Sequence, residues 1–255
     1  DSHQAMTIPE GEQSESADDE GTAYLLRSIV PRGPLGPVWP AGPKRKINHS
    51  VKEGLLKSEL HDVMEFNPAL AKELILALLI HEPLPANRHR DFMGGNHFVH
   101  IDDCSDWNPS MFFRGPFLAF LQLNPQHGIE TIVELINFAT SRWIEKYDNS
   151  TIEVVLGGHA KTLNGNMKVY FWYRDPPWQD NALVCALMAL EKWLYDMLQS
   201  GKPVAEHCRK IINESTSVAI FGVLACVGRR YPKLFESELA ELIPIWQFQV
   251  WEDNY

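Results

Sequence analysis

A sequence phrase that recurs along the chain constrains its fold most strongly. In each copy an apolar stretch ends, a Pro follows, preceded by Asn in the two best copies, and an amphipathic stretch begins. Asn, Pro, Glu, Ile and Leu recur at the same five offsets in residues 67–79 and 124–136, and a looser copy begins at Tyr231-Pro232. Asn caps helix N-termini through its side-chain oxygen, and Pro fits the first helical position, where no amide donor is needed. The phrase therefore predicts helix pairs, which must stack on one another to bury their apolar faces.

The fold class predicted by this repetition is mainly α, with stacked antiparallel helix pairs of the α-solenoid kind and one inserted β-hairpin. We expect the helical-repeat domain to span residues 49–250. Apolar side chains at helical spacing indicate where its helices lie. The expected helices span residues 51–66, 68–80, 116–123, 129–144, 181–199, 204–213, 218–230 and 232–243. The helix at 181–199 has little polar surface, so we expect it to be central.

The periodicity changes between the two halves of this helical array. Two β-rich stretches, residues 151–156 and 167–173, flank a turn signal at Asn164-Gly165. This pattern predicts a β-hairpin at about 151–173. One of its faces must pack on the helices, while the other is either core or an exposed recognition surface, for which aromatic side chains and an arginine are suitable anchors. The candidate interaction residues are Tyr170, Trp172, Arg174 and Trp178.

Residues 1–48 differ in composition from the rest of the chain. The first 21 are acidic and serine-rich, so we expect a disordered tail. From Pro31 to Pro43, proline recurs at every third residue, which is the period of polyproline II. This tract is either an extended connector, the commoner role, or a ligand for an aromatic groove of the SH3 type.

Charge and cysteine content limit the classes of partner. The formal net charge is −10, which argues against nucleic acid and anionic membrane surfaces as partners. The longest uncharged apolar run, residues 217–228, is shorter than the ~20 residues that cross a bilayer. The four cysteines form no CxxC pair, so we expect reduced thiols in a cytoplasmic protein. The chain begins at Asp1 without an initiator Met, and we expect it to be a piece of a larger polypeptide.

Candidate metal ligands are concentrated in residues 89–106. A His-x-x-His-x-x-x-Cys run there could supply zinc ligands from a single loop. The candidate ligands are His97, His100, Cys104 and Asp102. Structural zinc sites usually show two tight Cys/His pairs, whereas this stretch has one loose run. The competing interpretation is a polar loop whose histidines cap neighbouring helix ends.

Residues 102–106 also match the DDxxD pattern, in which helical carboxylates bind magnesium and a diphosphate. Pro109 would cut such a helix short, and no second acidic motif follows at 213–217, so the match is unspecific. The alternative function is therefore a small metal-dependent enzyme, either a zinc hydrolase or a magnesium/diphosphate enzyme, that uses the 89–106 loop. The glycine-rich stretch at 157–162 lacks phosphate-loop spacing and precedes a turn, so we exclude a phosphate loop there.

Four segments carry a resemblance to a known class of protein. They are residues 113–121, 128–143, 186–195 and 217–225, the last running on to Tyr231-Pro232. Together they resemble the helical region downstream of the nucleotide-binding domain in large bacterial signal-transduction ATPases of the STAND type, several of which act in anti-phage defence. The likeness covers about residues 65–247, and its motifs are helical packing phrases.

This resemblance implies a non-catalytic protein-interaction or sensor segment of a larger bacterial ATP-binding signalling protein. The implied partner is another protein or other domains of the same polypeptide, and no cofactor is implied. The chain lacks the phosphate loop of such proteins, so any ATPase activity would lie outside it, and no functional residue is carried over.

Overall fold

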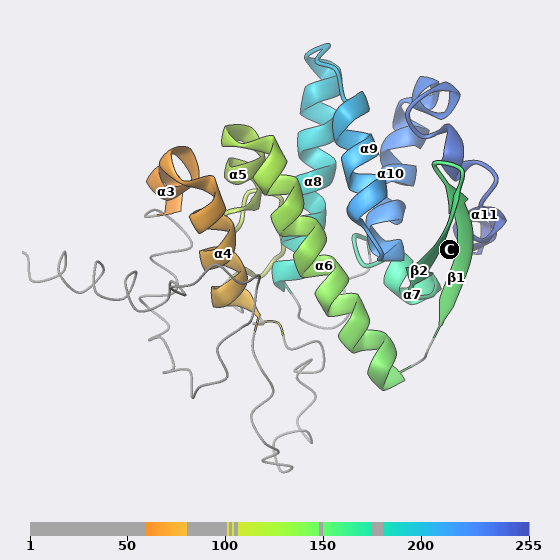
Figure 1. Cartoon of the computed structure of the whole chain (residues 1–255), viewed down its shortest axis with the longest axis horizontal. Helices are drawn as coiled ribbons and strands as arrows, with labels where there is room; N and C mark the ends of the chain where they lie inside the picture. The colour runs from red at the N-terminus through yellow and green to blue at the C-terminus, as the bar shows by residue number, and fades with distance from the viewer. Residues whose placement is uncertain are drawn as a thin grey trace, which may run out of the picture. The chain divides into compact units, whose positions relative to one another are not determined.

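The computed structural model describes residues 60–80, 101, 104, 107–147, 150–174 and 181–254 (Figure 1). The expected acidic tail, the Pro-rich connector and the first part of the helix expected at 51–66 lie outside the described residues. The described part is mainly helical, with one two-stranded antiparallel sheet, as the sequence predicted. Among its helices, none combines the length and the apolar character needed to cross a bilayer.

The helices lie side by side from α4 through α6 and α8 to α9 and α10, and the hairpin and α11 lie at the far end of this row (Figure 1). The α-helices before the hairpin are α3 (Leu60–Phe66), α4 (Pro68–Leu79), α5 (Phe117–Leu123) and α6 (Pro125–Tyr147). Those after it are α7 (Met167–Tyr170), α8 (Asn181–Gln199), α9 (Ala205–Glu214), α10 (Val218–Arg230) and α11 (Trp246–Asp253).

Both copies of the Asn-Pro phrase begin a helix in the predicted way. The side-chain oxygen of Asn67 accepts a hydrogen bond from the amide of Leu70 at 3.2 Å, at the start of α4. That of Asn124 accepts one from the amide of His127 at 3.2 Å, at the start of α6. The predicted N-caps are therefore confirmed, and equivalent hydrogen bonds begin the second helix of each of the first two pairs.

The core lies around α8 and α10. Each of these helices buries ten side chains or glycines, and α8 contacts α5, α6 and α10, so the prediction that α8 is central is confirmed. Gly222 in α10 lets α7 approach closely. A Cβ atom at this position would lie 2.3 Å from the carbonyl oxygen of Tyr170, which no real contact allows. The lack of a side chain at Gly222 thus sets the depth at which α7 packs.

The hairpin is shorter than predicted. Strand β1 (Thr151–Leu156) pairs with β2 (His159–Asn164), and the turn between them is Gly157-Gly158, where both φ angles are positive. The predicted second strand at 167–173 is wrong. Its first four residues form α7, because Asn166 accepts hydrogen bonds from the amides of Lys168 and Val169 and so begins a helix. The stretch that we excluded as a phosphate loop contains the hairpin turn.

The third copy of the phrase does not form the expected α-helix at 232–243. Two short 3₁₀ segments, η5 (Pro232–Glu236) and η6 (Ala240–Leu242), replace it. This copy has Tyr231 in place of Asn, and within the described residues no side chain caps η5. The backbone at Ser237, with φ −139° and ψ −97°, then interrupts the helical path. Helix α11, which the sequence analysis did not predict, follows beyond Pro244.

Candidate functional site

The predicted interaction residues do not form an exposed face. Tyr170 and Trp172 are 0% and 1% exposed, so their prediction as anchors of a recognition surface is wrong. The physical reason is the secondary structure. On a strand one face of this segment could remain free, whereas α7 and the turn after it are wound against α10. Arg174 lies at the surface in an ion pair with Glu252, and Trp178 lies outside the described residues.

The chain's own last helix covers this aromatic segment. The rings of Tyr170 and Phe248 stack with centroids 5.1 Å apart and planes at 26°. Trp251 lies one helical turn along α11 from Phe248, and its ring is 5.3 Å from that of Tyr170. Phe248 also stacks on Phe221 of α10, at 5.9 Å. Two aromatic side chains of α11 therefore rest on an aromatic floor supplied by α7 and α10.

Charged side chains hold the edge of the same contact. One carboxylate oxygen of Glu252 in α11 accepts from Arg229 Nη1 at 2.5 Å and from Arg174 Nη1 at 3.4 Å. Arg229 also donates to the hydroxyl of Tyr173 at 3.3 Å. Burial alone would lower the pKa of Arg229, but the hydrogen bond and charge of Glu252 raise it overall. Glu252 is thus the acidic counterpart of two arginines.

The contact leaves two polar atoms without a hydrogen-bond partner among the described residues. They are the hydroxyl of Tyr170 and the second carboxylate oxygen, Oε1, of Glu252, and both are buried. Burial raises the pKa of Tyr170, and the negative charge of Glu252 adds to the shift, so the hydroxyl stays protonated. A buried donor or acceptor that lacks a close hydrogen-bond partner costs free energy. The packing of α11 on α7 and α10 therefore leaves two polar atoms without full hydrogen bonding.

The opposite side of α11 and the short segment before it expose apolar side chains. Ile243, Trp246 and Val250 are 50%, 62% and 39% exposed. Within α11, the spacing of i and i+4 places Trp246 and Val250 on one side of the helix, away from Phe248, and Ile243 lies three residues before the helix begins. We call these three residues the apolar strip.

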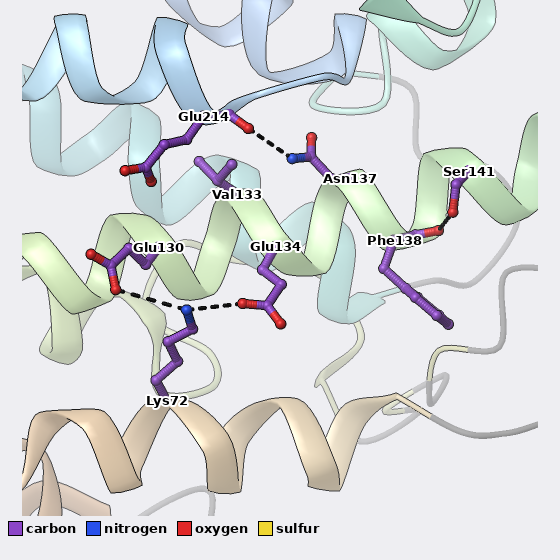
Figure 2. A pocket seen from close by; sticks show the side chains of 8 residues that line it. All are labelled: Lys72, Glu130, Val133, Glu134, Asn137, Phe138, Ser141 and Glu214. Carbon is purple, nitrogen blue, oxygen red and sulfur yellow. Dashed lines mark hydrogen bonds and ion pairs between the residues drawn. The ribbon is translucent and has the colours of Figure 1, made fainter. Parts of the chain in front are cut away.

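A second feature is an open hollow of about 450 Å³ between α4, α6 and the end of α9 (Figure 2). Lys72 of α4 reaches between two carboxylates of α6, with its Nζ atom 2.9 Å from Glu134 and 3.7 Å from Glu130. Beside the hollow, Lys210 of α9 binds Glu130 at 2.8 Å and Glu214 at 2.6 Å. These five side chains form the ion-pair chain that links three helices.

Glu130 is the centre of the ion-pair chain, since it binds both lysines. Burial alone would raise its pKa, but the hydrogen bond and charge of Lys210, together with the charge of Lys72, lower it overall. Nearby, the Asn137 side chain donates to the carbonyl of Glu214 at 3.0 Å and accepts from the amide of Thr216 at 2.9 Å (Figure 2). The charges that line the hollow are mutually paired, and their effect is to join helices.

The predicted metal ligands cannot be assembled from the described residues. His97, His100 and Asp102 lie outside them, and Cys104 is buried with a positive φ of 43°. Within the described ranges, no group of three or more His, Cys, Asp or Glu side chains is arranged to hold a metal ion. The metal site therefore stays a prediction.

Sequence reasoning missed the main contacts of this region. Helix α11 is not predicted from the sequence, because the last expected helix ends at residue 243, before Pro244. The Phe248-x-x-Trp251-Glu252 spacing, which places two aromatic side chains and a carboxylate on one side of a helix, was a usable signal. The ion-pair chain had a partial signal, because Glu130 recurs at a fixed offset in the Asn-Pro phrase, but its lysine partners come from other helices.

A comparison with known protein families finds no match to this sequence, and no curated protein matches it significantly.

Proposed function

We propose that this chain is a non-catalytic protein-interaction or sensor segment of a larger bacterial ATP-binding signalling protein. The apolar strip is the observation that carries the proposal. A tryptophan that is 62% exposed, with Val250 one helical turn along α11 and Ile243 exposed just before the helix, is a costly surface for a chain to leave in water. Apolar anchors one turn apart on one side of a helix, as Trp246 and Val250 are, are typical of a helix that lies in the groove of another protein.

The way α11 is held supports this role. Phe248 and Glu252 fix one side of the helix to α7 and α10, so the apolar strip is presented on an ordered element. An interface that is ordered before binding loses less conformational entropy when the partner arrives. Tryptophan is also enriched among the residues that dominate binding energy. The proposed partner is another protein, or another domain of the same polypeptide.

The ion-pair chain is the proposed relay of the sensor. Its lysines and glutamates are partly exposed, and exposed ion pairs contribute only about 0–1 kcal/mol each. Glu130 binds a lysine from α4 and another from α9 through its two oxygens, so a small shift of one helix lengthens one of these ion pairs and keeps the other. In this mechanism, partner binding changes the packing between helix pairs, and the change is passed to a nucleotide-binding domain elsewhere in the polypeptide.

The test compares ATP hydrolysis by the larger protein with and without residues 50–250. Loss of partner-stimulated hydrolysis, with basal hydrolysis retained, is expected for the deletion. Trp246→Asp should abolish stimulation, whereas Ser200→Asp, at an exposed site in the turn after α8, should not. Hydrolysis that needs no partner and is unchanged by the deletion contradicts the proposal.

Elemental analysis of the purified chain tests the rival enzyme hypothesis. About one zinc per chain, lost in both His97→Ala and Cys104→Ala, would favour a metal-dependent enzyme over the interaction segment.

A further inference from the structure

We infer that α11 is an exchangeable strap, and that the surface beneath it is a binding site for an amphipathic helix carrying two aromatic residues and a carboxylate at positions i, i+3 and i+4. In the described state the chain's own α11 fills this site with Phe248, Trp251 and Glu252. The ligand class is therefore a partner helix with the same three groups. The inference goes beyond the proposed function, since it concerns the inner side of α11 and not the apolar strip.

The site beneath α11 has the features of a helix receptor, and we call it the seat. Its floor is Tyr170 and Phe221, whose rings stack on Phe248 at 5.1 and 5.9 Å. Its rim is Arg174 and Arg229, which both approach one carboxylate oxygen of Glu252. An aromatic floor with a basic rim is complementary to an acidic aromatic helix, and the seat selects its ligand by both properties.

Helix α11 is ordered through its contacts with the seat and has few stabilising features of its own. Of its eight residues, all of them described, Phe248 alone is buried. No side chain within the described part of the chain caps its N-terminus. Isolated helices shorter than about 12–15 residues are marginal in water, so α11 is helical because it is seated. Its release would be a local unfolding of the C-terminal segment, without disruption of α8 or α10.

The two unpaired atoms make exchange reasonable. In the seated state Tyr170 Oη and Glu252 Oε1 are both buried and make no close hydrogen bond among the described residues, although the two side chains interact with each other. Each atom regains hydrogen bonds to water when α11 leaves, which offsets part of the aromatic contact that is lost. A partner helix that offers an acceptor to Tyr170 would replace α11 with a better-satisfied contact.

The experiment uses a fluorescent peptide of residues 244–255 and the full chain. Peptide binding is measured by anisotropy on the unchanged chain and on the Glu252→Ala chain, whose own strap is weakened while the seat is intact. We expect the Glu252→Ala chain to bind the peptide about tenfold more tightly, since its strap competes less well. Arg229→Ala added to that chain damages the seat and should reverse the gain. Equal binding by the unchanged and Glu252→Ala chains would overturn the inference.

Two altered peptides separate the seat from the apolar strip. A peptide with Glu252→Ala should bind about tenfold more weakly, because it has lost the group that meets the two arginines. A peptide with Trp246→Asp is the matched control, and it should bind as the natural peptide does, because Trp246 faces solvent. Equal affinity of the natural and Glu252→Ala peptides would contradict the proposed ligand chemistry, whatever the outcome for partner binding through the strip.

Hydrogen exchange on the unchanged chain tests the strap without any substitution. The backbone amides of residues 248–253 should exchange through local opening, faster than those in the middle of α10. Exchange of α11 only together with α10, at the rate of global unfolding, would show that α11 is a fixed part of the core and would overturn the inference.

Discussion

Tyr170 of α7 stacks on Phe248 of α11, with the two rings 5.1 Å apart and 26° from parallel. This contact joins the aromatic segment after the hairpin to the last helix of the chain. Tyr170, one of the residues predicted to recognise a partner, is therefore covered by the protein itself. The exposed apolar side chains lie one layer further out, on the far side of α11.

The close approach of α7 to α10 predicts that a glycine-to-alanine change in α10 lowers the stability of the protein. Replacing glycine by alanine in a helix interior normally stabilises by about 1 kcal/mol. At Gly222 the new methyl group would lie 2.3 Å from the Tyr170 carbonyl oxygen, so we expect destabilisation by about 1–3 kcal/mol instead. Urea unfolding monitored by circular dichroism measures the difference. A Gly222→Ala chain that is more stable than the natural one would refute this packing.

The two Asn caps should contribute equally to stability. Asn67→Ala and Asn124→Ala each remove the side-chain acceptor for an amide at the start of a helix, which costs about 1 kcal/mol. Asn213→Ala, at an exposed position near the end of α9, is the matched control and should change the unfolding free energy by less than about 0.5 kcal/mol. Equal losses of unfolding free energy in all three variants would show that the two caps do not stabilise the protein specifically.

The ion-pair chain predicts a pH-dependent contribution from Glu130. Its pKa is lowered in the folded protein, so its stabilisation is present above the unfolded value near 4.5 and is lost as pH falls through the folded pKa. Glu130→Gln should cost about 1 kcal/mol at pH 7 and progressively less below pH 4.5. Glu73 occupies the equivalent position in the first Asn-Pro phrase but is exposed, so Glu73→Gln should have little effect at either pH. A Glu130→Gln penalty that does not shrink in acid would count against the ion pairs.

Lys161 should anchor the hairpin to α9. Its ammonium group donates to the carbonyls of Ile212 and Asn213 at 2.6 and 2.7 Å, at the C-terminal end of α9. Burial lowers the pKa of Lys161, which shows that this charge is partly withdrawn from water. Lys161→Met should destabilise by about 1–2 kcal/mol, while Lys168→Met, at an exposed position of α7, should not. Thermal unfolding of the two variants gives the comparison, and equal melting temperatures would rule out the anchor.

Local signals in the sequence predicted much of the helical scaffold. The bounds of α8 and α10 agree with the predicted 181–199 and 218–230, because long apolar-periodic stretches specify helices strongly. The Asn-Pro phrase predicted both caps, since a cap depends on residues within a few positions of each other.

Tertiary contacts determine the features that local sequence patterns did not predict. Residues 167–173 have high β-propensity, but Asn166 caps a helix there and Gly222 makes room for it, so packing overrides propensity. Two turn signals competed for the hairpin, and Gly157-Gly158 forms the turn in place of Asn164-Gly165. The seat for α11 depends on contacts between α7 and α11, which are far apart in the sequence. No local sequence pattern predicts such a contact.

The most direct test of the proposed interaction role is site-specific photo-crosslinking from the apolar strip. A photoreactive phenylalanine analogue would replace Trp246 in the proposed larger protein, with Ser200 as the exposed control position. We predict a discrete crosslink from position 246 to a protein partner or to another domain of the same polypeptide. It should be absent at position 200 and lost when Ile243 is changed to Asp. If position 246 yields no discrete crosslink while the protein is folded and active, the proposal that this strip is an interaction surface is contradicted.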